Sequence, residues 1–314
     1  MKLSVLMVTY NHERFIAQAI KSVLAQRVNF DYEIVVGEDC STDKTRDILM
    51  DFHRLYPDRI VPLLRDRNVG GGRNLEATLA ACQGQYLALL EGDDYWISKD
   101  KLKRQVEFLD THPDFAICCH RAQILNEVDI GYADVSPSLA AGSYTIEDLL
   151  KDNFVMTSTT VLRRDLFAPL PRCFSEMNPG DWPRLVLAAR QGKIELMDET
   201  MAAYRVHSGG IWSSLPLTSR LRDTIRMLTA LDQYLGFQYT RTIRRTIAHT
   251  YFELACHARQ DGNRTETGKH LANCLRYGGW HLRGSRRTLA AFAAFTLLGS
   301  WRKVFTRWER VRRS

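Results

Sequence analysis

The sequence lacks the features of several protein classes. Its seven cysteines are scattered, odd in number and without a CxxC pair, which argues against a disulfide framework or a zinc site and favours reduced thiols in the cytosol. No apolar run is long enough to span a bilayer. The apolar stretch at residues 3–8 is too short for the core of a signal peptide, so we interpret it as a first strand. We therefore expect a cytoplasmic protein.

The charged residues are distributed unequally along the chain. The whole of 314 residues is 45% hydrophobic and 25% charged, as in ordinary folded proteins, with a net charge of +7. Residues 211–314 hold 19 Lys and Arg against 6 Asp and Glu, which leaves 24 basic and 30 acidic residues in 1–210. An acidic front part suits a cation site, and a basic end suits an anionic surface.

Apolar periodicity predicts alternating strands and helices in the first two-thirds of the chain. Strands are expected at residues 3–8, 32–36, 60–64 and 85–90, with helical patterns between them. This alternation is typical of an α/β fold with a mostly parallel sheet flanked by helices, in which ligands bind beyond the carboxyl ends of the strands. The pattern is helical from about residue 213. We therefore expect a catalytic domain over 1–213 and a basic helical C-terminal region over 214–314.

Acidic side chains follow two of the expected strands. Glu91, Asp93 and Asp94 come directly after the strand at 85–90, and carboxylates of this kind bind Mg²⁺ or Mn²⁺, which can bridge a diphosphate. Glu38 and Asp39 follow the strand at 32–36, where a carboxylate can accept hydrogen bonds from a nucleobase or ribose. The alternative for both clusters is a polar turn that caps the next helix.

A glycine-rich segment precedes the third expected helix. Gly70, Gly71 and Gly72 lie between Asn68 and Arg73. Glycines before a helix let backbone N–H groups approach a phosphate, and an arginine can pair with its oxygens. A glycine turn with no ligand is the alternative.

These segments occur in a familiar order and spacing. Together with Thr9-Tyr10-Asn11, Gly180-Asp181-Trp182 and residues 204–210, they resemble family-2 glycosyltransferases with the GT-A fold, over residues 1–213. The resemblance implies a GT-A, Rossmann-like catalytic domain. It also implies a metal-dependent, inverting transferase that uses a nucleoside-diphosphate sugar, most often a UDP-sugar.

The resemblance also implies roles for single residues on the donor side. Tyr10 and Asp39 resemble uracil contacts, Glu38 assists from the same turn, and Arg73 resembles a diphosphate contact. The full set of implied nucleotide-sugar contacts is Thr9, Tyr10, Asn11, Glu38, Asp39, Asn68, Arg73, Glu91, Asp93 and Asp94.

Metal binding and proton transfer are assigned in the same way. Asp93, Asp94 and His207 are the implied ligands of Mn²⁺ or Mg²⁺, and Glu91 stands where the family's D-x-D motif has its first Asp. Asp181 falls at the position of the catalytic base, with the helix cap as its alternative role. In an inverting transfer such a carboxylate takes the proton of the attacking hydroxyl. The metal, Arg73 and His207 would stabilise the leaving diphosphate.

The end of the chain has a separate pattern. Residues 283–314 contain nine Lys and Arg but one acid, Glu309, and an apolar stripe at helical spacing consists of Leu297, Trp301, Val304, Trp308 and Val311. This pattern is typical of an amphipathic helix on an anionic membrane. Packing of the stripe on the catalytic domain is the alternative. Nucleic acid is not expected as a partner, because no recognition motif accompanies the charge.

The leading hypothesis is a cytoplasmic glycosyltransferase, which would be peripheral at the inner face of the plasma membrane if its basic end binds lipid. It would transfer a sugar to a glycan or lipid-linked acceptor in cell-surface glycan assembly. A nucleotidyltransferase is one alternative, but it would need a glycine-rich loop where the chain has Thr9-Tyr10-Asn11-His12. A non-catalytic nucleotide-sugar-binding protein is the other, and the presence of both Asp93 and Asp181 argues against it.

Overall fold

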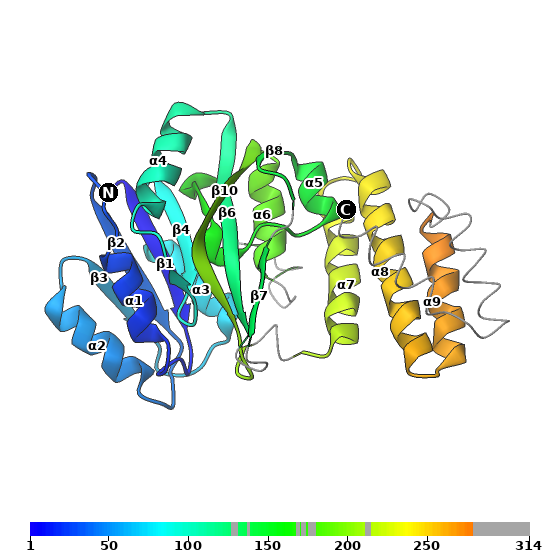
Figure 1. The fold of residues 1–314 in the computed structure, drawn as a ribbon, viewed down its shortest axis with the longest axis horizontal. Helices are drawn as coiled ribbons and strands as arrows, with labels where there is room; N and C mark the ends of the chain where they lie inside the picture. Colours follow the sequence, from blue (N-terminus) through cyan, green and yellow to red (C-terminus); the bar gives the residue numbers. More distant parts are fainter. Residues whose placement is uncertain are drawn as a thin grey trace. The chain divides into compact units, whose positions relative to one another are not determined.

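The chain forms two compact units (Figure 1). The computed structural model describes residues 1–126, 131–136, 139–167, 170, 174, 180–210 and 215–278. The first unit consists of the described residues within 1–149, 153–174 and 180–210, and the second contains 150–152 and 215–278. The expected domain boundary between residues 213 and 214 falls outside the described residues.

A ten-stranded sheet forms the centre of the first unit among the described residues. Its order is β3-β2-β1-β4-β9-β6-β10-β5, with β7 paired to β6 and β8 paired to β10. The strands are β1 (Leu3–Thr9), β2 (Tyr32–Glu38), β3 (Ile60–Leu64), β4 (Tyr86–Glu91), β5 (Tyr95–Trp96), β6 (Phe115–Asn126), β7 (Gly131–Ser136), β8 (Gly142–Tyr144), β9 (Val161–Arg163) and β10 (Lys193–Val206). The helices of this part of the chain are α1 (Ile16–Leu24), α2 (Thr45–Leu55), α3 (Gly71–Ala81), α4 (Lys101–Thr111), α5 (Ile146–Lys151) and α6 (Asp181–Ala189).

The first half of the sheet is parallel, as its sequence predicts. β1 lies between β2 and β4 and pairs with both in parallel, and β2 pairs in parallel with β3. The register places Thr9 beside Glu38 and Val8 beside Glu91. The carboxyl ends of three neighbouring strands therefore meet at one edge, with the polar residues that follow them.

The second half of the sheet is mixed. The short strand β9 runs antiparallel between β4 and β6, while β10 runs parallel to β6. The prediction of an α/β sheet flanked by helices and followed by a helical region is confirmed. Strands β5 to β10 are additional to the four expected strands, and among them β5, β7, β8 and β9 are short and antiparallel to their neighbours.

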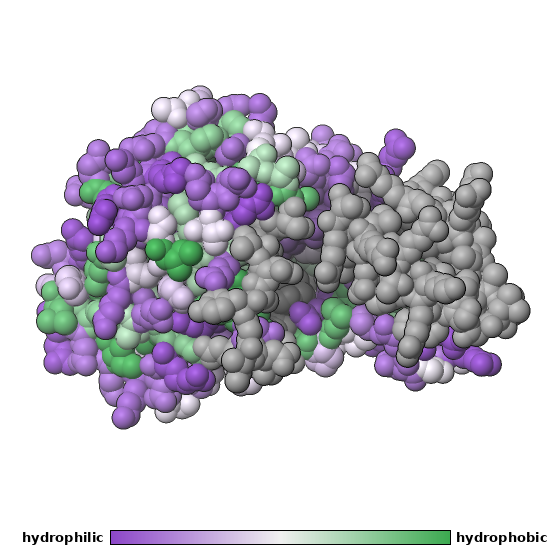
Figure 2. All heavy atoms as spheres, viewed as in Figure 1, coloured by the Kyte–Doolittle hydropathy of each residue, from purple (hydrophilic) through white to green (hydrophobic). Residues whose placement is uncertain are grey.

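The second unit is helical. Its helices are α7 (Leu217–Tyr234), α8 (Thr240–Gln260) and α9 (Arg264–Arg276). α8 and α9 share an apolar core that includes Phe252, Cys256 and Cys274. No helix in the described part of the chain is long and apolar enough to cross a bilayer, and the described surface on the face drawn in Figure 2 is mostly hydrophilic. The basic segment at 283–314 lies outside the described residues.

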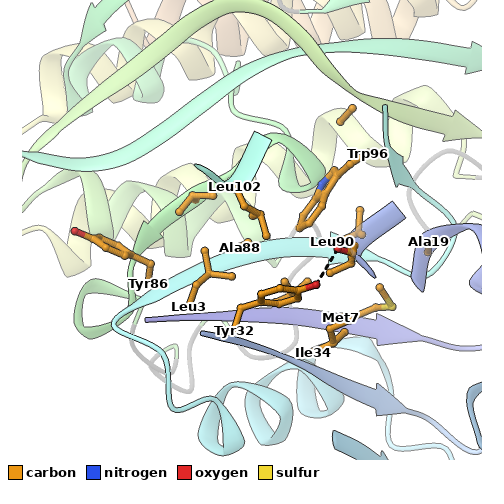
Figure 3. Packing of buried hydrophobic residues seen from close by; sticks show 14 of the residues in the cluster. Leu3, Met7, Ala19, Tyr32, Ile34, Tyr86, Ala88, Leu90, Trp96 and Leu102 are labelled. Carbon is orange, nitrogen blue, oxygen red and sulfur yellow. Dashed lines mark hydrogen bonds between the residues drawn. The ribbon is translucent and has the colours of Figure 1, made fainter. Parts of the chain in front are cut away.

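Helices cover both faces of the parallel half. On one face, alternate residues of β1 such as Leu3 and Met7 pack with residues of α1, α2 and α4 in the core that Figure 3 shows. On the other face α3 approaches β2 closely at Gly37. A Cβ atom at Gly37 would lie 2.0 Å from Oγ1 of Thr78, and Nδ2 of Asn74 donates to the Gly37 carbonyl at 2.7 Å. This contact places the N-terminus of α3 at the carboxyl edge.

Candidate active site

The predicted site segments come together at the carboxyl edge of the parallel strands. The loop after β1 is joined to the loop after β2, because the backbone N–H groups of Asn11 and Glu13 donate to Ser41 and Asp43 at 3.0 Å each. The loop after β2 is joined in turn to the segment before α3 through Asp39. Asp93, after β4, faces the β1 loop. Four segments separated in the sequence thus form one surface.

Asp93 lies between two imidazoles. Nε2 of His207 is 3.0 Å from Oδ2 of Asp93, and Nε2 of His12 is 3.6 Å from the same oxygen. Burial works to raise the pKa of Asp93, but the hydrogen bond from His207 and the charges of His12 and His207 bring it below its usual value. His12 has no role in the predicted site, although it directly follows the Thr9-Tyr10-Asn11 motif.

Asp94 supports the turn rather than facing outward. Asp94 is only 1% exposed. Its Oδ1 accepts a hydrogen bond from the backbone N–H of Arg205 at 2.8 Å. The Arg205 guanidinium donates to the Asp93 carbonyl and, at 2.6 Å, to Oε1 of Gln18. Among the described residues, Oδ2 of Asp94 and the Ser158 hydroxyl are both buried without a hydrogen-bond partner. Asp94 and Arg205 therefore hold Asp93 in place.

Asp181 is close to this acidic turn. It begins α6, and its Oδ2 accepts a hydrogen bond from the Thr157 hydroxyl at 3.1 Å. Burial raises the pKa of Glu91 well above its usual range, and the charges of Asp94, Asp93 and Asp181 raise it further. Burial and the same four carboxylates also raise the pKa of Tyr204. The predicted base is thus joined to the acidic turn through Thr157 and its neighbour Ser158, whose carbonyl accepts a hydrogen bond from Nε1 of Trp96 at 2.8 Å.

The acids after β2 have mainly internal partners. Asp39 is 2% exposed, and its two oxygens accept hydrogen bonds from the N–H groups of Val69 at 2.8 Å and Gly70 at 2.9 Å. Glu38 is fully buried, and its oxygens accept from Ser41 N at 2.6 Å and Arg46 Nε at 2.5 Å. The prediction of Glu38 as a nucleotide contact does not fit the structure, because none of its surface is exposed.

Two of the predicted donor contacts are exposed. Tyr10 is 37% exposed beyond β1, and Arg73 is exposed in the first turn of α3, without a polar partner in the described part of the chain. Thr9 is buried and its hydroxyl lies 3.2 Å from Nδ1 of His12. Two further predicted contacts, Asn11 and Asn68, stabilise the loops. Asn11 adopts a left-handed backbone with φ of 54°, and Asn68 Oδ1 accepts a hydrogen bond from Gly70 N at 3.1 Å.

The donor atoms around Asp93 suit a divalent cation. No group of three or more His, Cys, Asp or Glu side chains is arranged as a metal site among the described residues. A carboxylate oxygen of Asp93 and an imidazole nitrogen of His207 nevertheless lie 3.0 Å apart. Carboxylates bind Mn²⁺ and Mg²⁺, and imidazole binds transition metals, so the pair favours Mn²⁺ of the two. These residues fit such an ion when a ligand, such as a diphosphate, supplies further oxygens.

Comparison with known sequences identifies relatives in several bacteria. Residues 4–170 match the family model for glycosyl transferase family 2. An uncharacterized protein of Mycobacterium tuberculosis is 36% identical over 213 residues, which are 68% of this chain and 61% of that protein. The chain therefore spans about three-fifths of that relative's length. A Bacillus subtilis protein named for glycosyl transfer in teichuronic acid biosynthesis, TuaG, is 28% identical over 214 residues, which are 67% of this chain and 81% of TuaG.

Two solved structures share the fold. Staphylococcus aureus TarS 1–349, solved with UDP-GlcNAc, aligns with a TM-score of 0.61 and 18% identity, over 88% of this chain and 92% of TarS 1–349. A mannosyltransferase from Pyrobaculum calidifontis, solved with GDP-Man and Mn²⁺, aligns with a TM-score of 0.54 and 14% identity, over 89% of this chain and 87% of that protein. Because the matched family model covers more than half of the 314 residues, the chain belongs to glycosyl transferase family 2.

Proposed function

We propose that this protein is a metal-dependent, inverting glycosyltransferase. It would move a sugar from a UDP-sugar to a hydroxyl group of a glycan or lipid-linked acceptor in the assembly of a cell-surface glycan. The observation that supports this most strongly is the chain of contacts from Asp181 to the acidic turn: the Thr157 hydroxyl donates to Asp181 at 3.1 Å, and the carbonyl of the next residue, Ser158, accepts from Nε1 of Trp96, two positions after Asp94, at 2.8 Å. A proton acceptor and a cation site therefore share one edge of the sheet.

The donor is proposed to lie across the carboxyl ends of β1, β2 and β4. The exposed ring of Tyr10 would contact the base, and a free lone pair of an Asp39 oxygen would accept a hydrogen bond from it. Arg73 and the N-terminus of α3 would contact the diphosphate, because a helix N-terminus and a guanidinium both favour phosphate oxygens. TarS bound to UDP-GlcNAc supports a nucleotide sugar as the ligand of this fold.

Asp93 and His207 would hold the divalent ion. When bound, the ion supplies positive charge that stabilises the diphosphate as it leaves. The mannosyltransferase solved with GDP-Man and Mn²⁺ supports this assignment for the fold. The chain's own contribution is a rigid turn, in which Asp94 and Arg205 keep Asp93 at the edge.

Asp181 is proposed to take the acceptor proton. The acceptor oxygen would form a bond to the anomeric carbon while the bond from that carbon to the diphosphate breaks, and the proton would pass to Asp181. The Thr157 hydroxyl donates to one oxygen of Asp181, and Trp182 N donates to the other at 2.8 Å. These two hydrogen bonds orient the carboxylate, and each oxygen retains a lone pair for the proton.

A nucleotide-release assay tests the proposal. UDP-GlcNAc, UDP-glucose, UDP-galactose and GDP-mannose would each be incubated with the full chain in Mn²⁺, in Mg²⁺ and in EDTA. We expect slow, metal-dependent release of UDP by hydrolysis from at least one UDP-sugar, and a rate about 10²- to 10⁴-fold lower, but still measurable, in Asp181→Asn. If nucleotide sugars bind but no donor is cleaved, the protein is a binding protein. Release that continues in EDTA would remove the metal from the proposal.

A further inference from the structure

An ion pair between a buried arginine and a half-buried glutamate joins the two helices that begin at the site. Nη2 of Arg184 in α6 lies 2.6 Å from Oε1 of Glu76 in α3, although the residues are 108 positions apart. The Arg184 side chain is 2% exposed and that of Glu76 is 31% exposed. Oε1 of Glu76 also accepts a hydrogen bond from the backbone N–H of Leu170 at 3.1 Å. The pair therefore connects α3, α6 and the segment between β9 and α6.

Each partner stands one helical turn behind a residue of the proposed site. Glu76 follows Arg73 by three positions in α3, and Arg184 follows Asp181 by three positions in α6. Residues three apart lie on the same side of a helix. Arg184 also reaches back to the start of its own helix, since Nη1 donates to the carbonyl of Gly180 at 2.7 Å. One guanidinium thus binds both the first turn of α6 and the side of α3.

The pair is not the arrangement that packing alone would require. Burying a charged pair costs desolvation, and apolar residues of similar volume often stabilise a core as well. Among the described residues, Nε of Arg184 is buried without a hydrogen-bond partner, which adds to that cost. The advantage of a guanidinium is that it fixes the orientation of its partners, because its planar donors form hydrogen bonds at defined angles.

We propose that the Glu76–Arg184 pair positions Asp181 relative to the diphosphate-binding end of α3. This inference rests on the proposed function. An inverting transfer requires the attacking oxygen and the leaving diphosphate on opposite sides of the anomeric carbon. The N-termini of α6 and α3 carry the residues for these two sides, and a displacement of about 1 Å at a reacting group can cost about 100-fold in rate. Glu76 and Arg184 act through Asp181 as positioning residues and touch no substrate.

A double-mutant cycle on donor hydrolysis tests the inference without an acceptor. Water then replaces the acceptor: its oxygen bonds to the anomeric carbon, the diphosphate leaves with the electron pair, and the proton passes to Asp181. The donor is whichever of the four sugars above the wild type cleaves. Arg184→Met should lower kcat by about 10- to 100-fold and leave KM for the donor unchanged. In an Asp181→Asn background the same change should have no further effect, because its effect passes through Asp181.

Matched variants separate positioning from general structural support. Arg163→Met is the control, since the Arg163 guanidinium bonds the carbonyls of Phe115 at 2.9 Å and Leu109 at 2.8 Å near Tyr86, where β4 begins. It should lower stability and leave kcat near the wild-type value. Arg184→Lys keeps the charge and should recover part of the rate. If Arg184→Met does not fold, Glu76→Gln replaces it in the same cycle.

The outcomes distinguish the inference from the proposed function. A wild-type protein that cleaves no donor overturns both. A wild type that cleaves a donor supports the function, and the cycle then decides the inference. If Arg184→Met and Asp181→Asn reduce kcat by independent factors that multiply, or if Arg184→Met changes KM alone, the pair does not position the base.

Discussion

Nε2 of His207 lies 3.0 Å from Oδ2 of Asp93, although 114 positions separate the two residues. His207 follows β10, and Asp93 follows β4. The contact exists because Arg205, two residues before His207, is bound to the same turn through the Asp93 carbonyl. The pair is therefore a product of the tertiary fold and a direct place to test the proposed metal site.

Replacing either residue should weaken metal-dependent binding of UDP. We expect His207→Ala and Asp93→Asn each to reduce UDP affinity in Mn²⁺ by at least about 10- to 100-fold. Loss of a residue that only supports a metal ligand already has an effect of this size. EDTA should reduce the affinity of the wild type to the level of the variants. Isothermal titration calorimetry with and without EDTA measures this. His112→Ala is the control, because His112 contacts Phe108 and Thr111. Equal UDP affinity in all samples would contradict the site.

Removal of the Thr157 hydroxyl should slow the reaction with little loss of donor affinity. Thr157→Val removes the donor to Oδ2 of Asp181 and keeps the volume, whereas Thr157→Ser keeps the hydroxyl. One hydrogen bond to a charged group contributes about 1.5–3 kcal/mol. We therefore expect kcat to fall by about 10- to 100-fold in the valine variant and to stay near wild type in the serine variant. Nucleotide release measures kcat and KM for both. Equal rates in the two variants would show that the hydroxyl has no such role.

Replacing the buried Lys101 should change how stability depends on pH. Lys101 is fully buried, with Nζ 2.8 Å from Oε1 of Gln105 and 4.2 Å from the Trp96 ring centre. Burial lowers its pKa from 10.5 to about 7. Above pH 7 the unfolded chain therefore holds one proton more than the folded chain, so the free energy of unfolding rises with pH by up to about 1.4 kcal/mol per unit. Lys101→Met should lose this contribution to the slope.

Urea unfolding between pH 7 and pH 8.5 measures the difference. Thiols of the unfolded chain have a pKa of about 8.5 and begin to ionise within this range, but the same thiols are present in both proteins, so the difference between wild type and Lys101→Met isolates the lysine. Burial raises the pKa of Cys118 to about 12, so at higher pH the unfolded chain loses thiol protons first and stability falls. Parallel pH dependences of wild type and Lys101→Met would mean that Lys101 remains charged in the fold.

Adding a methyl group at Gly37 should destabilise the first unit. The new Cβ would lie 2.0 Å from Oγ1 of Thr78 and 2.7 Å from Oδ1 of Asn74. Overpacking of this kind costs about 1–3 kcal/mol, and the change should appear in the midpoint of urea unfolding. Thr78→Ala in the same chain should restore part of the loss. Gly268→Ala, within α9 and with open space around it, is the control and should be neutral or stabilising. Equal urea midpoints for Gly37→Ala and Gly268→Ala would show that the close approach at Gly37 does not limit the side chain there.

Removal of residues 283–314 should release the protein from anionic vesicles and leave UDP binding intact. The segment lies outside the described residues, so this prediction rests on its nine basic residues and its apolar stripe. A peripheral location at the inner face of the plasma membrane is proposed on the same grounds. Each basic residue near an anionic surface contributes about 1 kcal/mol, and salt screens the attraction. Flotation with anionic and neutral vesicles at low and high salt measures it. A full chain that ignores anionic vesicles at low salt would contradict the membrane role.

The parallel half of the fold could be predicted because its signals are local. β1, β2 and β4 are apolar runs, and a buried parallel strand needs that pattern. The clustering of Asp39 and Asp93 at one edge then follows from strand direction alone. β9 has three residues, which is too short to show a period. Its antiparallel place between β4 and β6 depends on pairing across the chain.

The partners of the site residues could not be predicted in this way. The pairing of Arg205 with Asp94, and of Arg184 with Glu76, joins residues more than 100 positions apart, and no spacing in the sequence marks such a contact. The burial of a site residue is equally hard to predict from the sequence. Glu38 and Asp39 are neighbours after one strand, yet only the structure shows that Arg46 engages Glu38 and that backbone N–H groups engage Asp39.

The joined loops after β1 and β2 also affect the entropy of binding. Asn11, His12 and Glu13 donate their backbone N–H groups to side chains of Ser41, Thr45 and Asp43. Ordering a loop when a ligand arrives costs conformational entropy, which reduces affinity. These hydrogen bonds already order the two loops before a ligand binds. A nucleotide would therefore lose none of its binding free energy to ordering those residues.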